Sequence, residues 1–271
     1  MDSSINFQEL FKGFQHTPCL WKASEVYNFE QFCPEATEVQ FTQESEVKKI
    51  RLGKWVEHFV AFQLKHQADI TILEENLQIK NNKITIGELD LLFLQAKKPI
   101  HLEIIYKFYL YDSTKNHNNA LYNWVGPNQS DALIYKLNKL KEKQLPLLYH
   151  LKTKDALKHY PFLINSITQK VCFKAQLFLP FKNQNINIVP LNSECIEGWY
   201  LNIKNMSQLK DYQFYIPNKL EWLCLPKLAV NWLEFEEAQK HIKIDIDNKR
   251  SPLCWIKNAN NDLQKCFITW W

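Results

Sequence analysis

The sequence predicts a mixed α/β protein in which helices flank a central sheet. Apolar residues make up 46% and charged residues 23% of the 271 residues, which is the balance of a folded globular chain. Stretches with apolar residues at helical spacing alternate with runs rich in β-branched and aromatic residues. Their order is a helix, a strand, a hairpin, a helix and further strands, which is typical of a mixed sheet with packed helices.

Three regions are expected within one domain. Residues 1–44 are predicted to form an N-terminal segment of short helices and loops packed on the core, and residues 45–160 to form the core itself. Residues 161–271 are predicted to add strands and a helix, a C-terminal α+β extension that completes the same domain. A chain of this length can bury a substantial core.

The first long helix is predicted over residues 45–67, with Ser45 as a suitable N-cap. Apolar residues recur in it near helical spacing, at Ile50, Val56, Phe59, Val60 and Leu64. Glu57 lies on the same helical face as Gly53. A glycine one turn earlier is expected to let that face approach the sheet closely.

A strand over 70–80 and a hairpin follow the helix. The hairpin pairs the apolar segments 85–94 and 100–111 across a turn centred on Lys97 and Lys98. The pairs expected from this turn are Leu92 with Glu103, Asp90 with Ile105, and Glu88 with Lys107.

Four charged side chains are expected on one face of the hairpin, because opposed residues and alternating residues share a face. They are Glu88, Asp90, Glu103 and Lys107. The other face is expected to carry Leu89, Leu91, Leu102, Ile104 and Tyr106. An odd change in the turn length would separate the acids.

A polar loop over 112–126 leads to Pro127, which suits the start of a helix. The helix is expected from about Ser130 to Gln144, with Leu133, Leu137 and Leu140 on one face and Lys136, Lys139, Lys141 and Lys143 on the other. Further strands are predicted at 171–181, 186–191, 199–203 and 212–217, and a helix near 227–241.

The composition excludes several classes of protein. The five glycines are too far apart to form a phosphate-binding loop, so no nucleotide cofactor is expected. No apolar run approaches the roughly 20 residues that cross a bilayer, so no membrane segment is expected. The seven cysteines are scattered singly and contain no C-x-x-C pair. This pattern predicts neither a zinc ribbon nor a disulfide framework and favours a reducing, cytoplasmic location.

The charge is unevenly distributed along the chain. Residues 1–46 contain eight acids and two lysines, a net −6, so the remainder carries +10 of the total of +4. Of the 33 basic residues only two are arginines. Lysines act as point charges on phosphates, so any contact with nucleic acid is expected to be mainly electrostatic. An AT-rich genome, which enriches Lys, Asn and Ile together, explains the lysines equally well.

Carboxylates crowded on a half-buried sheet face are costly unless a cation accompanies them. Mg²⁺, or Mn²⁺ in its place, is the ion expected here, because Mg²⁺ binds carboxylate oxygens and water. Lys107 is positioned to hold an attacking water or a phosphate oxygen. The alternative is an ordinary ion pair between Glu88 and Lys107 on a solvated face, with Glu57 as an exposed helix acid.

The same residues resemble the PD-(D/E)xK nuclease superfamily, which places a Glu on a helix, an Asp on a strand, and Glu-x-Lys on the next strand. The matching stretches are RLGKWVEHF with Glu57, IGELDLLF with Asp90, and HLEIIYKFYL with Glu103 and Lys107. More closely, the chain resembles a bacterial family catalogued as domain of unknown function 1853. That resemblance covers about residues 51–226, and GPNQSDALIYKL is its most specific stretch.

The resemblance implies a restriction-endonuclease-like fold and metal-dependent hydrolysis of phosphodiester bonds, in DNA before RNA. Glu57, Asp90 and Glu103 would bind the metal, and Asp90, Glu103 and Lys107 would form the catalytic group. The usual lysine lies two residues after the glutamate, where this chain has Ile105. Lys136 is therefore the substitute candidate.

Three lysines on the following helix, Lys136, Lys139 and Lys143, are expected to contact the nucleic-acid backbone. A solvated helix face explains them equally well. Two further functions remain open. One is a catalytically inactive nuclease-like fold that acts as a nucleic-acid-binding or adaptor module. The other is a protein-interaction domain that uses the many tryptophans, including Trp270 and Trp271.

Overall fold

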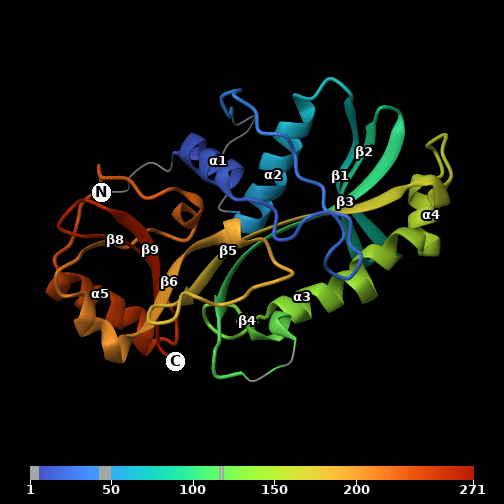
Figure 1. Ribbon diagram of the computed structural model, residues 1–271. Helices are drawn as coiled ribbons and strands as arrows, with labels where there is room; N and C mark the ends of the chain where they lie inside the picture. Colours follow the sequence, from blue (N-terminus) through green and yellow to red (C-terminus); the bar gives the residue numbers. More distant parts are fainter. Residues whose placement is uncertain (1–5, 43–49, 116, 118) are drawn as a thin grey trace.

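The computed structural model describes residues 6–42, 50–115, 117 and 119–271. A nine-stranded mixed sheet runs through the protein in the order β1-β2-β3-β5-β6-β9-β8-β7, and β4 pairs with β3 beside this path (Figure 1). The strands are β1 Ile70–Asn81, β2 Ile84–Gln95, β3 Lys98–Tyr111, β4 Trp124–Val125, β5 Thr168–Pro180, β6 Ile196–Asn202, β7 Gln213–Tyr215, β8 Leu253–Lys257 and β9 Leu263–Thr269.

The central strands of the sheet are parallel and its two ends are antiparallel. Neighbours β3, β5, β6 and β9 run parallel, whereas β1, β2 and β3 form an antiparallel meander. Strands β7, β8 and β9 are antiparallel at the opposite end. The mixed α/β class expected from the sequence is therefore confirmed.

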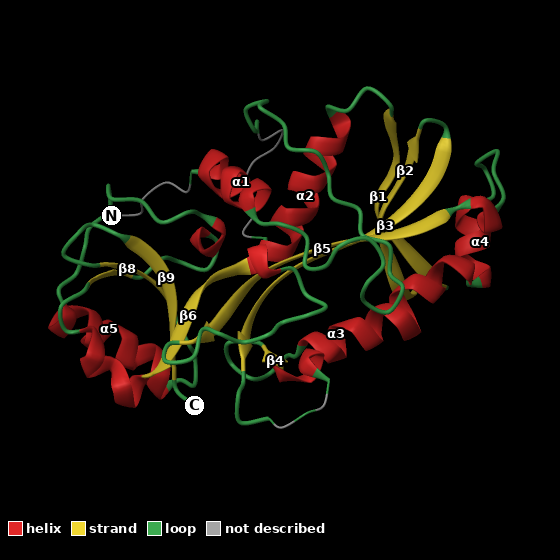
Figure 2. Ribbon diagram, viewed as in Figure 1, coloured by secondary structure: helices red, strands yellow, loops and turns green. Residues whose placement is uncertain are grey.

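Helices cover both faces of the sheet (Figures 1 and 2). Helices α1 (Phe7–His16) and α2 (Leu52–Lys65) lie on one face, and α3 (Leu133–Lys139) and α4 (Leu151–Leu157) lie on the other. Helix α5 (Phe235–Asp247) packs with the C-terminal strands. Within the residues described, no helix combines the length and apolar character needed to cross a membrane.

Strand β3 separates two hydrophobic cores. Leu102 and Ile104 are buried with α1 and α2, whereas Ile105 and Tyr109 are buried with Leu133 and other residues of α3. A strand that is buried on both faces shows nearly continuous apolar sequence, which is why the segment 100–111 is apolar at most positions.

An N-terminal segment over residues 19–33 covers the edge of β5. The backbone N–H of Leu20 donates to Phe173 O at 2.8 Å, and that of Phe32 donates to Val171 O at 2.8 Å. Cys19 and Cys33 are joined by a disulfide with a Cα–Cα distance of 6.3 Å. This pair was not expected, because the thirteen residues between the two cysteines contain no motif that shows the loop folding back on itself.

The register of the hairpin differs from the expected one by two residues. Ala96 and Lys97 form the turn with φ angles of 46° and 68°, and Leu92 pairs with His101. A two-residue turn with positive φ at both positions matches the twist of the two strands it joins. Such turns usually have the sequence Asn-Gly, which is absent here, so the sequence did not indicate where the turn lies. Because the error is an even number, Asp90 and Glu103 keep their predicted common parity, one position beyond the last pair of Leu91 with Leu102.

Several other elements differ from the predictions. Helix α2 begins at Leu52 rather than at residue 45, and Ser45 lies outside the described residues. The loop over 112–126 contains a short 3-10 turn and β4, and residues 186–191 form no strand. The last helix lies over Phe235–Asp247 rather than 227–241. Strands β8 and β9 were not predicted. By contrast, the strand predicted over 70–80 is confirmed as β1.

The helix expected from Ser130 to Gln144 is divided into different helical forms. Helix α3 ends at Lys139, a π-helical turn (η2) spans Leu140–Gln144, and a 3-10 turn (η3) spans Leu145–Tyr149. The apolar face predicted for this segment is confirmed, since Leu133, Leu137 and Leu140 are fully buried. Single π turns inside helices often occur at functional sites.

The tryptophans are mostly part of the folded body. Trp199, Trp222 and Trp255 are buried. Trp271 donates a hydrogen bond from Nε1 to Pro127 O at 2.9 Å, so the last residue lies against the loop that precedes α3. These contacts account for the aromatic residues through packing.

Candidate active site

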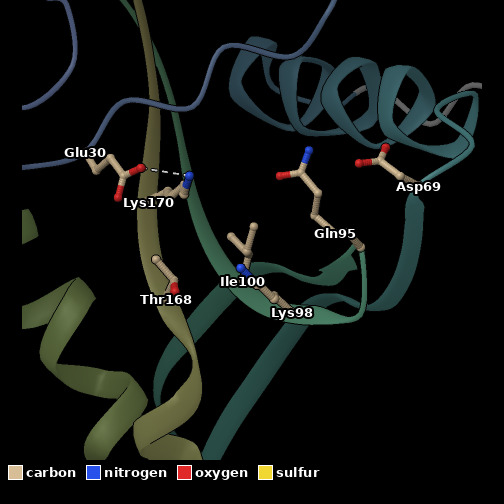
Figure 3. A pocket seen from close by; sticks show the side chains of 8 residues that line it. Glu30, Asp69, Gln95, Lys98, Ile100, Thr168 and Lys170 are labelled. Carbon is tan, nitrogen blue, oxygen red and sulfur yellow. Dashed lines mark ion pairs between the residues drawn. The ribbon is translucent and has the colours of Figure 1, made fainter.

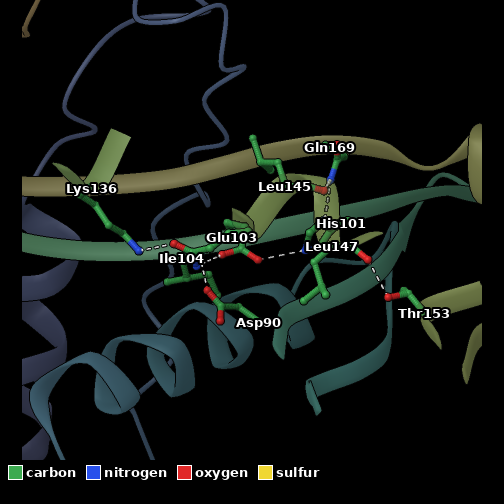
Figure 4. Close-up of polar contacts among 10 residues, drawn as sticks. Asp90, His101, Glu103, Ile104, Lys136, Leu145, Leu147, Thr153 and Gln169 are labelled. Carbon is green, nitrogen blue, oxygen red and sulfur yellow. Dashed lines mark hydrogen bonds and ion pairs between the residues drawn. The ribbon is translucent and has the colours of Figure 1, made fainter. Parts of the chain in front are cut away.

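The site lies where β2 leaves β3. The pairing of the two strands ends at Leu91 and Leu102. At the next position the Asp90 carboxylate accepts a hydrogen bond from the backbone N–H of Ile104 at 2.8 Å through Oδ2 (Figure 4). The carboxylate thus satisfies a backbone donor that β2 no longer reaches.

The alternation of β2 breaks at Asp90. Leu91 packs with α1 and α2, whereas Leu89 packs with Leu92 and Leu148 in another cluster. In a regular strand Leu89 and Leu91 would share a face. The strand therefore rotates at this point, and the expectation that these two leucines share a face is wrong. The rotation turns Glu88 toward Lys54 of α2, whereas Glu103 projects toward α3. The expectation that Glu88 shares a face with Glu103 and Lys107 is therefore also wrong.

Three carboxylates converge here. Glu57, Glu88 and Asp90 each offer an oxygen atom, and these atoms all lie within 4.8 Å of one another. Lys54 lies against the group: its Nζ is 2.7 Å from Glu57 Oε2 and 2.5 Å from Glu88 Oε1. It also donates to Asn76 Oδ1 at 2.8 Å.

Gly53 does not have the role expected of it. A Cβ atom added at Gly53 would meet no atom within 4 Å, so the residue faces open space. The helix packs on the sheet through the buried side chains of Val56 and Val60, which share a core with residues of β3. The side chain of Glu57 is 14% exposed.

Glu103 is fully buried beside this group. Its Oε2 accepts a hydrogen bond from Gln144 Nε2, and its Oε1 lies 3.2 Å from Nε2 of the equally buried His101. Since Glu103 projects toward α3 and Glu57 comes from α2, Asp90 stands between the two acids. The structure therefore brings Glu57 and Asp90 together with Glu88. Glu103 lies outside this group of three, close enough for its charge to raise the pKa of Asp90.

The electrostatics show that the acids are short of positive charge. Burial, together with the negative charge of Glu103, raises the pKa of Asp90 to about 8. Burial also raises the pKa of Glu57, against the opposing effect of Lys54. A carboxyl group with a pKa near 8 takes a proton at neutral pH unless a cation binds beside it. A divalent cation would provide that compensation.

Two lysines lie near the acids in different situations. Nζ of Lys107 forms an ion pair with Asp131 at 2.5 Å, and both side chains are about one-third exposed. Lys136 Nζ donates to Gln144 Oε1 at 2.7 Å. Burial lowers the pKa of Lys136 to about 8, although the nearby Glu103 charge acts in the opposite direction.

The remaining lysines predicted to contact nucleic acid differ from Lys136. Lys139 and Lys143 are exposed, whereas Lys136 is half-buried and turned toward the acids. Lys136 therefore lies beside the candidate site, and the other two lie on the surface next to it.

Sequence reasoning missed several residues of the site. Glu88 was expected on the acidic face but not as a ligand, and Lys54, His101, Asp131 and Gln144 were not singled out. His101 carried a usable signal, because it lies two residues before Glu103 and thus on the same strand face. Gln144 carried none, because its position depends on the π turn.

A cavity of about 350 Å³ lies at the turn end of the hairpin, away from the acids (Figure 3). Lys98 and Ile100 line it from β3, and the ion pair between Glu30 and Lys170, at 2.8 Å, crosses one side. None of the clustered carboxylates lines this cavity.

Comparison with known proteins gives one family. Neither the curated proteins nor the solved structures include a significant match to this chain. A family model described as "Domain of unknown function (DUF1853)" matches residues 33–266. The matched region covers most of the chain and contains every residue of the candidate site. The chain therefore belongs to the DUF1853 family.

Proposed function

We propose that this protein is a metal-dependent nuclease with a restriction-endonuclease-like core, which hydrolyses phosphodiester bonds of DNA or, in second place, of RNA. The observation that carries the proposal is the convergence of Glu57, Glu88 and Asp90, whose oxygen atoms lie within 4.8 Å of one another. Buried Glu103 stands beside them and contributes to the raised pKa of Asp90.

The donor set fits Mg²⁺ or Mn²⁺. Carboxylate oxygens are the ligands these hard cations prefer, and crowded acids with raised pKa values gain most from a divalent charge. Glu57, Asp90 and Glu103 would hold the ion, with Glu88 as an additional ligand. When bound, such an ion supplies a water of lowered pKa and polarises the phosphate.

Lys136 is the better candidate for the site lysine. Its ammonium interacts electrostatically with both Glu103 and Asp90, and it approaches from α3. An ammonium in this place stabilises negative charge that develops on the phosphate oxygens. Lys107 remains the alternative, although it would first have to break its ion pair with Asp131. Lys139 and Lys143, which are exposed, would contact the backbone of the substrate.

Cleavage of plasmid DNA and of labelled oligonucleotides tests the proposal. The unaltered protein should cleave with Mg²⁺ or Mn²⁺ and not with EDTA. The Asp90→Asn variant should lose cleavage, because a neutral amide is a weak ligand for a hard cation. Asp155→Asn is the matched control, since the Asp155 side chain is 71% exposed and distant from the acids. Equal cleavage by both variants would overturn the proposal.

Three ion pairs favour a second candidate, a nuclease-like binding module without catalysis. Lys54 already forms ion pairs with Glu57 and Glu88, and Lys107 is paired with Asp131. A protein of this kind would bind nucleic acid with a strong dependence on salt and leave it intact in Mg²⁺ and Mn²⁺.

A further inference from the structure

A chain of side-chain hydrogen bonds passes through the site from α3 to β5 (Figure 4). Lys136 Nζ donates to Gln144 Oε1 at 2.7 Å, and the Gln144 amide donates to Glu103. The other oxygen of Glu103 lies 3.2 Å from His101 Nε2, and His101 Nδ1 lies 3.0 Å from the amide nitrogen of Gln169. Five side chains from four elements thus form one continuous network.

Both ends of the chain have a fixed polarity. An ammonium can only donate, so Gln144 must accept from Lys136 through Oε1 and present its amide nitrogen to Glu103. At the other end, Gln169 Nε2 donates to the backbone carbonyl of Leu145 at 2.7 Å, which fixes the orientation of this amide. Its second N–H then points at His101 Nδ1.

The fixed ends determine the tautomer of His101. Because Nδ1 accepts from Gln169, the ring proton lies on Nε2 and is donated to Glu103. Glu103 therefore accepts two hydrogen bonds, one on each oxygen. Every donor in the network is then matched with an acceptor. His101 and Glu103 are both 0% exposed. A buried carboxylate that lacks its donors is strongly destabilising, so the network has few alternative arrangements.

We propose that His101 and Gln144 are positioning residues that hold the Glu103 carboxylate in one orientation for metal binding, and that Gln169 acts on it through the tautomer of His101. The inference rests on the proposed nuclease function and adds three residues to it. Each carboxylate oxygen accepts more than one bond, so a hydrogen bond on each still leaves lone pairs for an ion.

The test measures the binding of Mn²⁺ alone by isothermal titration calorimetry. His101→Leu removes the donor, whereas His101→Gln keeps an N–H at a similar reach. Partners that orient a metal ligand typically contribute ten- to hundredfold in affinity, so His101→Leu should weaken Mn²⁺ binding by about that factor. His101→Gln should restore an affinity close to that of the unaltered protein. Equal affinities in all three proteins would overturn the inference.

Gln169→Met provides a second test that leaves both partners of Glu103 in place. It removes the bond that sets the tautomer, and it should weaken Mn²⁺ binding while the fold persists in EDTA. Gln184→Met, at an exposed glutamine, is the matched control. A lower melting temperature of Gln169→Met with unchanged Mn²⁺ affinity would mean a structural role only, and would contradict the inference.

The two proposals fail in different ways. If the unaltered protein binds Mn²⁺ and the His101 and Gln169 variants bind it equally well, the nuclease proposal stands and the positioning role falls. If the unaltered protein binds no Mn²⁺, both fall together.

Discussion

The Asp90 carboxylate accepts the backbone hydrogen bond of Ile104 at the point where β2 separates from β3. One side chain thus ends a strand pairing and places an acid between Glu57 and Glu103. The same residue has two tasks, and a substitution that removes the whole carboxyl group affects both. Asparagine keeps an oxygen acceptor and removes the charge, so it separates the two tasks.

The stability of the metal-free protein should depend on pH through Asp90. Burial and the charge of Glu103 raise its pKa from 3.8 to about 8. Between these two values the folded state holds a proton that the unfolded state has released. The stability that protonated Asp90 contributes is therefore fully present below about pH 4 and is lost as the pH rises through about 8. We expect Asp90→Asn to unfold at a higher temperature than the unaltered protein in EDTA at pH 8.5, with the difference shrinking toward pH 4. Parallel pH profiles would contradict the assignment.

Lys54→Met should bind Mn²⁺ more tightly than the unaltered protein. The ammonium of Lys54 lies between Glu57 and Glu88, where it competes with a divalent cation. Calorimetry measures the affinity, and Lys65→Met is the control because Lys65 pairs with Glu75 at 2.9 Å elsewhere on the same helix. Weaker binding by Lys54→Met would show that Lys54 supports the ion rather than competing with it.

Lys136→Met should reduce the rate of cleavage far more than Lys139→Met. A single donor to a developing oxyanion typically contributes a factor of about 10²–10³, whereas a surface contact to the backbone mainly affects binding. Single-turnover cleavage at saturating protein separates the two effects. Lys107→Met completes the series. A larger loss of cleavage rate in Lys107→Met than in Lys136→Met would show that Lys107, on β3, is the site lysine.

Two glycines should respond oppositely to alanine. A Cβ at Gly13 would lie 2.0 Å from the backbone oxygen of Leu223, so Gly13→Ala should destabilise the protein by at least about 1–3 kcal/mol, as overpacked sites do. A Cβ at Gly53 meets nothing within 4 Å. Gly53→Ala should therefore stabilise α2, by up to about 0.5–1 kcal/mol. Urea unfolding measures both, and equal effects would contradict the packing of α1 against the turn at Leu223.

The sequence predicted the elements that carry continuous apolar patterns. Strands β2, β3 and β5 were found because apolar residues fill most of their positions, and β1 because apolar residues recur in a short run between polar ones. The parity that places Asp90 and Glu103 together also held, although the turn was misplaced by two residues. A register shifted by an even number of residues changes every pair of opposed residues but leaves each side chain on its expected face. The expected relation between Asp90 and Glu103 therefore survived the misplaced turn.

The features that were missed depend on contacts between distant segments. The rotation of β2 at Asp90 places Leu89 in the same hydrophobic cluster as Leu148, a residue distant in sequence, and no local pattern indicates it. The π turn that presents Gln144 lies in a segment whose side chains would equally suit a continuous helix. The partner of Lys107 is Asp131, on a loop whose course depends on β4.

The pairing of β3 leaves one interval of its backbone without a neighbouring strand on one side. Along one side, β3 is bonded to β5 without interruption from Ile100 to Leu110. Along the other, its pairing with β2 stops at Leu102 and its pairing with β4 begins only at Leu110. Asp90 accepts its hydrogen bond from Ile104 within this interval of seven residues. If the protein acts on nucleic acid as proposed, a polynucleotide that approaches along this interval would pass between the β-hairpin and the loop before α3. The width of that passage would then select among single strands, duplex ends and continuous duplex.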